Sequence, residues 1–267
     1  VFNRQLDGAA GLALMGAGRL NEIVANALKD GLLPEYELVG VLGNNPEKTQ
    51  AFVDRHNCVA CTDIQALMDL KLDFTAEAAS PQAVIDYSET VLESGSHLVV
   101  ITVGAFADAE LYNRVKETAR KNGTKVYIAS GAVGGFDVLR TAAFMGPIKA
   151  TMTSKKSLQS LFYSPLFKEH YLTITEPEQA FTGSTKEAIE QLPFHYNVAV
   201  ATALASAGPE ETTLNIDVVP NFRGDDYKIV IEGEEVLTDI NIYSRTPRIA
   251  GWSIVAVLQN AVSPIVF

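Results

Sequence analysis

Hydrophobic and polar positions change period repeatedly along the first half of the chain. Short apolar runs typical of buried strands are followed by stretches whose apolar residues recur every three or four positions, as in amphipathic helices. The predicted strands are 11–15, 36–42, 72–80, 97–104 and 125–130, with a shorter one at "CVACT". The predicted helices are 19–30, 46–56, 81–95 and 108–123, with a shorter one at "DIQALMDL". This alternation predicts an α/β fold built on a doubly wound parallel sheet, whose ligands bind at the carboxyl ends of the strands.

The pattern changes after about residue 146. "IKATMTSKKSL" and "EQAFTGS" are predicted strands, and "STKEAIEQL" is a helix that begins with a capping box of Ser184 and Glu187. The segment 196–208, "YNVAVATALASAG", is an apolar helix. Three alternating strands follow, "TTLNIDVVP", "YKIVIEG" and "VLTDINIYS". We therefore expect a second, α+β domain on a mixed or antiparallel sheet, and a final helix at "RIAGWSIVAVLQNAV".

Composition and charge exclude some classes of partner. The chain of 267 residues is 47% hydrophobic and 20% charged, as in globular proteins. Its net charge of −11 argues against nucleic acid and anionic membrane, which are held mainly by Lys and Arg. No apolar run reaches the roughly 18 residues of a membrane span, and no signal-peptide pattern is found. We expect a cytoplasmic protein that binds a small molecule.

The two cysteines, Cys58 and Cys61, have the spacing of a redox pair or of half a zinc site. A structural zinc site needs four ligands, and His56 adds only one. We interpret the cysteines as small apolar residues beside a strand, and predict no metal site.

A glycine-rich turn joins the first predicted strand to the first helix in "LALMGAGRLNEI". Gly16 permits a tight turn, and Gly18 lets backbone N–H groups approach a pyrophosphate. Asn21 stands where the dinucleotide-binding pattern has a third glycine, which allows close packing of helix and strand. A plain strand-to-helix turn is the alternative, but the position at the start of a βαβ unit favours a Rossmann dinucleotide site. Arg19 and Leu20, which begin the helix, are then predicted cofactor contacts.

The end of the second strand bears on the choice of cofactor. An acidic residue there would bind the ribose 2′-hydroxyl of NAD, but the chain reads "VLGNNPEK", with uncharged Asn44. A 2′-phosphate would not be repelled, and Arg19 or Lys48 lies near in sequence. We predict NADP, or both NADP and NAD; alternatively, Asn44 only begins the turn before Pro46.

These elements suggest two domains. Residues 1–132 with 247–267 are the predicted Rossmann domain, and 133–246 the predicted α+β domain for substrate binding and dimerisation.

Several segments together resemble the L-aspartate dehydrogenase family. They are "EAAS" (77–80), "ITVGAFAD" (101–108), "SGAVGGFDVLRTAA" (130–143), "FTGSTKEAIEQLP" (181–193) and "YNVAVATALASAG" (196–208). The resemblance extends from about Leu12 to Val262. It implies reduction of NAD(P) coupled to oxidative deamination of aspartate through iminoaspartate, and, by analogy, a homodimer.

The resemblance also implies particular cofactor contacts. The cofactor lies on the glycine turn, and we include Ala79 and Ser80 among its contacts. The nicotinamide pocket uses the alanine of SGA(I/V)GG, here Ala132, and the asparagine of NVA, here Asn197. The neighbouring glycines would let backbone approach a flat ring, and an asparagine amide suits a carboxamide. We expect Ser130 to cap the helix that follows.

The chain departs from the family at its histidine. The family's "N-x-H-(E/R)-I" segment, taken to hold the catalytic acid/base, reads "DDYKIVIEG" here, and Tyr227 occupies the histidine position, 30 residues after Asn197. Imidazole has an unperturbed pKa near 6.5, whereas a phenol has one of about 10. A phenol acts as a base only if its pKa is strongly lowered, for example by a lysine. Lys228 would point to the opposite face of the strand, and Lys155 and Lys156 are further candidates.

His195, two residues before Asn197, is the other candidate for proton transfer, with a structural role as the alternative. The family's C-terminal "NPKTS"-like segment is altered to "YSRTPRIAGWS", in which Arg245 and Arg248 remain as candidate carboxylate clamps.

Three functions remain open from the sequence. The first is an active NAD(P)-dependent dehydrogenase that acts on aspartate or another small amino acid, with Tyr227 or His195 polarising or protonating. The second is an NAD(P)-binding protein without turnover, suggested by the missing histidine. The third is a Rossmann reductase of another substrate, since a fold does not fix a function.

Overall fold

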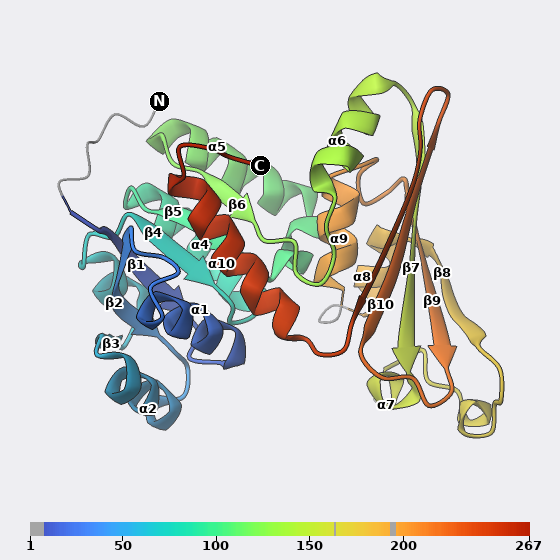
Figure 1. The fold of residues 1–267 in the computed structure, drawn as a ribbon, viewed down its shortest axis with the longest axis horizontal. Coiled ribbons are helices and arrows are strands. Elements are labelled where there is room, and N and C mark those ends of the chain that lie inside the picture. The colour runs from blue at the N-terminus through green and yellow to red at the C-terminus, as the bar shows by residue number, and fades with distance from the viewer. Residues whose placement is uncertain (1–7, 163, 193–195) are drawn as a thin grey trace. The chain divides into compact units, whose positions relative to one another are not determined.

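The protein is described by a computed structural model that covers residues 8–162, 164–192 and 196–267. It forms two compact units, one extending to Ala129 and including Ala250–Phe267, the other comprising Ser130–Ile249. These limits lie three residues from the domain limits proposed from the sequence. Each unit has its own sheet (Figure 1).

The sheet of the first unit has six parallel strands in the order β3-β2-β1-β4-β5-β6. The strands are β1 (Ala10–Met15), β2 (Tyr36–Leu42), β3 (Val59–Cys61), β4 (Phe74–Glu77), β5 (His97–Val100) and β6 (Val126–Ile128). The predicted doubly wound parallel sheet is confirmed. The direction of winding reverses between β1 and β4, and ligands of such sheets bind at the carboxyl ends of these strands.

The helices of this unit connect its strands. They are α1 (Arg19–Lys29), α2 (Pro46–His56), α3 (Ile64–Met68), α4 (Pro81–Glu93), the 3-10 helix η1 (Val103–Ala107) and α5 (Ala109–Asn122). The strands predicted over 72–80 and 97–104 are shorter than expected. The chain after β4 turns so that Ser80 can cap α4, and η1 takes up the end of the other segment.

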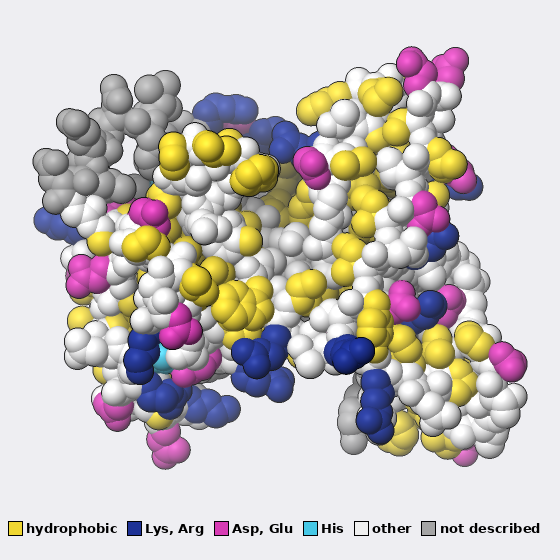
Figure 2. All heavy atoms as spheres, in the orientation of Figure 1, with side chains coloured by type: hydrophobic (Ala, Val, Ile, Leu, Met, Phe, Trp, Pro, Cys, Tyr) yellow, Lys and Arg dark blue, Asp and Glu magenta, His cyan; other side chains and the backbone are white. Residues whose placement is uncertain are grey.

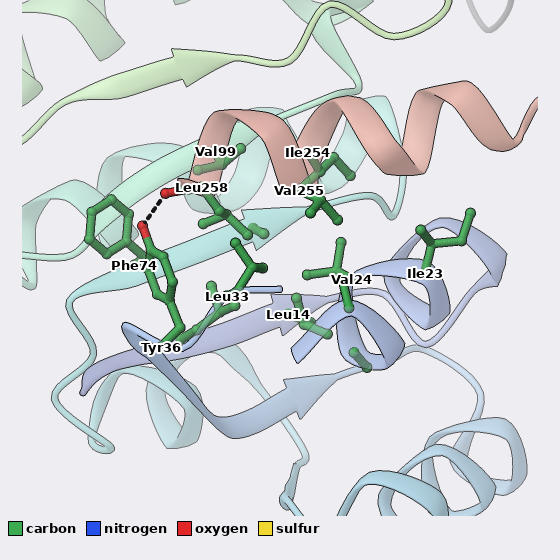
Figure 3. Packing of buried hydrophobic residues seen from close by; sticks show 14 of the residues in the cluster. Leu14, Ile23, Val24, Leu33, Tyr36, Phe74, Val99, Ile254, Val255 and Leu258 are labelled. Carbon is green, nitrogen blue, oxygen red and sulfur yellow. Dashed lines mark hydrogen bonds between the residues drawn. The ribbon is translucent and has the colours of Figure 1, made fainter. Parts of the chain in front are cut away.

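Helix α10 (Arg248–Val262), from the end of the chain, packs on the same core as α1. Ile254 and Leu258 of α10 join Leu14 of β1 and Val24 of α1 in one buried cluster (Figure 3). The buried hydroxyl of Tyr36 donates to the carbonyl oxygen of Leu258 over 2.7 Å. This bond fixes the last helix to the beginning of β2.

The second unit contains a five-stranded mixed sheet in the order β11-β10-β7-β9-β8. Its strands are β7 (Ile148–Ser157), β8 (Glu178–Ser184), β9 (Thr212–Val219), β10 (Asp225–Gly233) and β11 (Leu237–Ser244). Strands β7 and β9 are parallel and the other pairs are antiparallel. The predicted second α+β fold is confirmed.

Five helices accompany this sheet among the described residues. They are α6 (Phe136–Met145), α7 (Leu158–Leu161), the 3-10 helix η2 (Glu169–Leu172), α8 (Thr185–Gln191) and α9 (Asn197–Leu204). The predicted capping box of Ser184 and Glu187 is present. The predicted cap at Ser130 is wrong: α6 begins after Gly135, whose φ of 75° together with the φ of 66° at Gly131 keeps the intervening residues in a turn.

Within the described ranges, no helix has the length and hydropathy needed to cross a bilayer. Figure 2 shows hydrophobic side chains interspersed with charged ones on the surface. The most exposed large apolar side chains of the second unit are Phe144 and Leu237, at 82% and 74%.

Candidate functional site

The glycine turn between β1 and α1 has the geometry of a phosphate-binding turn. Gly16 has a φ of 101°, and a Cβ there would lie 2.7 Å from the carbonyl oxygen of Ala78, so no larger residue fits. Gly18 caps α1 with extended backbone and without a side-chain hydrogen bond. A Cβ on Gly18 would meet nothing within 4 Å. Packing within the described protein therefore does not require a glycine at position 18, and the space over it is open to a ligand.

Asn21, in the position of the third glycine, stabilises this turn by hydrogen bonds. Its side chain is fully buried, and its amide nitrogen donates to the carbonyl oxygens of Met15 and Gly16 over 2.8 and 2.7 Å. A glycine there would only allow α1 to approach β1, but the asparagine joins them by hydrogen bonds. The departure from the three-glycine pattern thus preserves the turn.

A cavity of about 460 Å³ opens beside the turn. This volume is in the range of about 300–1,000 Å³ that is usual for ligand pockets. Five of the predicted cofactor residues line it, and they come from the ends of three neighbouring strands: Gly16, Gly18, Asn44, Ala79 and Ser80.

Arg19 and Leu20, the other two predicted contacts in this unit, are not among the lining residues. They begin α1, so their backbone N–H groups have no acceptor within the helix. A phosphate group is a suitable acceptor for such groups.

The cavity wall also contains residues that were not predicted. Thr62 and Asp63 follow β3, while Asp86 and Tyr87 lie on α4. The sequence contained a partial signal for the first pair, because β3 lies next to β2 in a doubly wound sheet and its carboxyl end faces the same edge. The α4 residues lie one to two turns beyond Ser80 and had no comparable signal.

Glu77 holds the loop that forms one side of the cavity. Its buried carboxylate accepts hydrogen bonds from the backbone N–H groups of Ala79, Ser80 and Thr102, and from the Thr102 hydroxyl. The distances range from 2.8 to 3.1 Å. One side chain therefore links the carboxyl ends of β4 and β5 and fixes the backbone of Ala79 and Ser80.

The end of β2 brings uncharged and basic groups to the cavity. Asn45 caps α2 by accepting from the backbone N–H of Lys48 over 2.9 Å, as its position before Pro46 indicates. Asn44 and Lys48 both line the cavity. Gly43 is required by packing, because a Cβ there would overlap the Thr49 side chain.

These features fit a dinucleotide. The first turn of α1 has backbone donors without a side-chain cap, the space over Gly18 is open, and the cavity extends to the end of β2, where a ribose binds in doubly wound folds. The chain thus has backbone donors at one end of the cavity and polar side chains at the other.

In the second unit, the structure brings the predicted nicotinamide residues near one another. A Cβ on Gly131 would lie 3.1 Å from the Val198 side chain, so the turn that holds Ala132 packs against the beginning of α9, where Asn197 lies. Ala132 is buried in the same hydrophobic cluster as Tyr227.

Tyr227 lies on the covered face of β10, opposite Ser154 of β7, and is buried. Its hydroxyl accepts a hydrogen bond from Lys156 Nζ and donates to Asp225 Oδ1, each over 3.3 Å. Lys228 points to the other face, as predicted, and pairs with Asp239 over 2.8 Å.

The phenol of Tyr227 is not prepared to act as a base. Burial, and in second place the nearby Asp225 carboxylate, raise the pKa of Tyr227 far above its ordinary value. The hydrogen bond from Lys156 does not reverse this effect. The pKa of Lys156 is lowered, mainly by burial, with Asp225 opposing the shift.

The remaining candidate residues are placed as follows. His195 lies outside the described residues. Arg245 and Arg248 are exposed, between β11 and the beginning of α10. Cys58 and Cys61 are free thiols, and burial raises the pKa of both, which does not favour reactive thiolates.

Two parts of the chain match known protein families. Residues 16–129 match the NAD-binding domain of homoserine dehydrogenase, and residues 137–261 match the C-terminal domain of aspartate dehydrogenase. The L-aspartate dehydrogenase of Archaeoglobus fulgidus is 31% identical, over 93% of this chain and 96% of the relative. That of Acinetobacter baumannii is 30% identical, over 95% of this chain and 98% of the relative.

Among solved structures, aspartate dehydrogenase from Thermotoga maritima has the same fold. Its TM-score is 0.78 at 23% identity, with 97% of this chain and 99% of that chain covered. Two sequence relatives at 30% identity or more, each matched over nearly its whole length, show the family. The chain belongs to the L-aspartate dehydrogenase family.

Proposed function

We propose that the protein is an NAD(P)-dependent dehydrogenase that oxidatively deaminates L-aspartate or a related small amino acid through an imino acid. The observation that carries this proposal is the glycine turn, with its open space over Gly18 and its uncapped helix α1, in a chain of this family. The family also favours this function over that of a reductase of an unrelated substrate.

Cofactor binding rests on the residues around the cavity. Gly16 and Gly18, with the N–H groups of Arg19 and Leu20, hold the pyrophosphate. Asn44 faces the adenosine ribose, and Ala79 and Ser80 form the opposite wall. The end of β2 has no acidic side chain and Lys48 lines the cavity, which supports NADP, or both cofactors, rather than NAD alone. When bound, the nicotinamide supplies a hydride acceptor.

For the nicotinamide and the substrate we propose residues of the second unit. Ala132 and Asn197 contact the nicotinamide, as the family resemblance implies and as the packing of Gly131 on Val198 supports. Tyr227 or His195 polarises or protonates the substrate, and Arg245 and Arg248 are proposed to bind its carboxylates. Tyr227 stands on the covered face of the sheet, in the cluster that contains Ala132.

One observation favours a second candidate, a dinucleotide-binding protein without turnover. The group at the family's histidine position is a phenol whose pKa is raised by burial and by Asp225. Such a group does not replace an imidazole as a base near neutral pH. On this alternative the cofactor binds but no amino acid is oxidised.

The deciding experiment measures formation of NADPH and NADH at 340 nm with purified protein, L-aspartate and each oxidised cofactor in turn. Binding of NADPH and NADH is measured in parallel by calorimetry. Turnover supports the dehydrogenase and identifies the cofactor. Absence of turnover with aspartate and a panel of small amino acids, in a sample that binds a cofactor, supports the second candidate.

We also propose that the protein is a homodimer and acts in the cytoplasm, where nicotinamide dinucleotides are available. Support for the dimer is the exposure of large apolar side chains on the second unit, including Phe144 and Leu237. Light scattering coupled to gel filtration would give the mass, and a value near 28.8 kDa, the mass of one chain, would contradict the dimer.

A further inference from the structure

The side-chain amine of Lys156 lies beside Tyr227, and the family resemblance assigns no role to it. Lys156 lies near the end of β7, two residues after the buried Ser154, on the same face of the sheet. Its Nζ is 3.3 Å from the Tyr227 hydroxyl, and 5.3 and 5.5 Å from the ring centres of Tyr227 and Tyr196. Two aromatic rings and one hydroxyl thus surround this amine.

The amine also borders a small cavity of about 70 Å³. Its wall is formed by Lys156, Ser160, Leu161, Ser164, Leu192 and Tyr196. Among the described residues that form this wall, Lys156 and Tyr196 are the titratable ones. A small polar group that enters the cavity meets the Lys156 amine.

The hydrogen bonds around Tyr227 have one consistent direction. Lys156 Nζ donates to the Tyr227 oxygen, and the Tyr227 hydroxyl donates to Asp225 Oδ1. The phenol keeps its proton and directs it at Asp225, so Tyr227 does not accept one from a substrate. It fixes the position of the amine instead.

The neighbouring lysine shows that this environment is particular to Lys156. Lys155 points to the other face of β7, is exposed, and pairs with Asp226 over 2.9 Å. Among the described residues, the titratable groups that face Lys156 are Asp225, Tyr227 and Tyr196. Asp225 favours the charged amine and burial opposes it. Burial is the larger effect and lowers the pKa of Lys156.

We propose that Lys156 is the group that accepts the proton from the substrate's ammonium, and that Tyr227 is a positioning residue that holds it. This inference rests on the proposed function. The neutral amine of Lys156 takes one proton from R–NH3⁺, giving R–NH2 and the Lys156 ammonium. The lone pair thus freed on the substrate nitrogen forms the C=N bond as the Cα hydrogen leaves as hydride to the oxidised nicotinamide cofactor. Release of the Lys156 proton to water restores the amine.

The test compares the same substitution on the two faces of β7. Lys156→Met keeps the length of the side chain and removes the amine, and Lys155→Met is the matched control. We expect kcat to fall about 10²-fold or more in Lys156→Met, the usual contribution of acid–base catalysis, and to stay within about twofold in Lys155→Met. NADPH affinity and the melting temperature show whether each variant is folded.

Two further variants distinguish proton transfer from packing or charge. Lys156→Arg keeps a cation that does not lose its proton, and we expect it to be as impaired as Lys156→Met. Small primary amines such as methylamine should restore part of the activity of Lys156→Met. Restoration that follows the pKa of the added amine is a readout that a merely structural lysine would not give.

The pH profile gives an independent readout. Because a base must be unprotonated, wild-type kcat should rise with pH through the pKa of Lys156 and reach a plateau, and this rise should be absent in Lys156→Met. Tyr227→Phe, which removes only the hydroxyl, should shift the rise without abolishing it. A wild-type-like kcat in Lys156→Met or Lys156→Arg would overturn the inference.

Failure of the inference is distinguishable from failure of the proposed function. If the wild-type protein oxidises no amino acid, the proposed function is wrong and the inference falls with it. If the wild-type protein is active and Lys156→Met is equally active, the dehydrogenase stands and only the role of Lys156 is wrong.

Discussion

The side-chain amide of Asn21 donates a 2.7 Å hydrogen bond to the carbonyl oxygen of Gly16. Gly16 is the residue whose positive φ makes the turn between β1 and α1 possible, so the asparagine acts on the turn itself. A second bond from the same amide to Met15 connects α1 to the end of β1. The residue that departs from the dinucleotide-binding pattern is therefore part of the support of the turn.

Asn21→Ala should destabilise the first unit and weaken cofactor binding. The change leaves the Gly16 carbonyl without its amide donor, and an unsatisfied buried polar group costs about 1–3 kcal/mol. We expect the melting temperature to fall by several degrees and the Kd for NADPH to rise several-fold. Asn26→Ala, the same change at an exposed position of α1, is the control. Equal melting temperatures and affinities for the two variants would contradict this role.

Glu77→Gln should loosen the loop that carries Ala79 and Ser80. The carboxylate accepts four hydrogen bonds, whereas the glutamine NH2 group would face a donor. We expect a loss of about 1–3 kcal/mol in the free energy of unfolding, measured by urea denaturation, and a higher Kd for NADPH.

Glu93→Gln, at an exposed position at the end of α4, is the matched control for that experiment and should leave both values unchanged. Glu77→Gln with wild-type affinity and stability would show that the loop does not depend on the carboxylate.

Asn44→Asp should shift cofactor preference toward NAD. The substitution adds one negative charge at the end of β2 with almost no change in size, and it would repel a 2′-phosphate while it accepts a hydrogen bond from a 2′-hydroxyl. We expect the Kd for NADPH to rise about tenfold and that for NADH to stay equal or fall. The two cofactors measured on one variant control for general damage, and an equal loss for both would contradict the placement of the ribose beside Asn44.

Local signals in the sequence were sufficient for much of the fold. Helix α2 begins at Pro46 because Asn45 caps it by accepting a hydrogen bond from the backbone N–H of Lys48. The capping box of Ser184 likewise defines the start of α8. The glycine turn was recognisable because its residues are contiguous. The predicted cap at Ser130 is wrong because the positive φ of Gly131 and Gly135 delays the start of α6 by several residues.

Contacts between residues far apart in the sequence could not be predicted from local sequence patterns. Lys156 and Tyr227 are 71 positions apart, and only the pairing of β7 with β10 brings them together. Alternation along β7 separates Lys155 from Lys156 by face but does not say which face the helices cover. Tyr87 lines the cavity because of the way α4 packs on the sheet, and local sequence patterns do not specify that packing.

Tyr227→His is expected to raise the rate of aspartate oxidation. An imidazole near its unperturbed pKa of about 6.5 exchanges protons at neutral pH, whereas the phenol of Tyr227 has a raised pKa and keeps its proton, in a hydrogen bond to Asp225. Acid–base catalysis contributes about 10²–10⁴-fold. An imidazole here would supplement the base that we propose at Lys156, so we expect a smaller gain, of about tenfold in kcat, with NADPH affinity unchanged. Tyr227→Phe has the same ring and no titratable proton, so it separates the gain of an imidazole from the loss of a hydroxyl. If the imidazole itself moves the proton, the gain persists in a Lys156→Met background. A kcat for Tyr227→His no higher than that of the wild type would contradict the placement of Tyr227 at the family's histidine position.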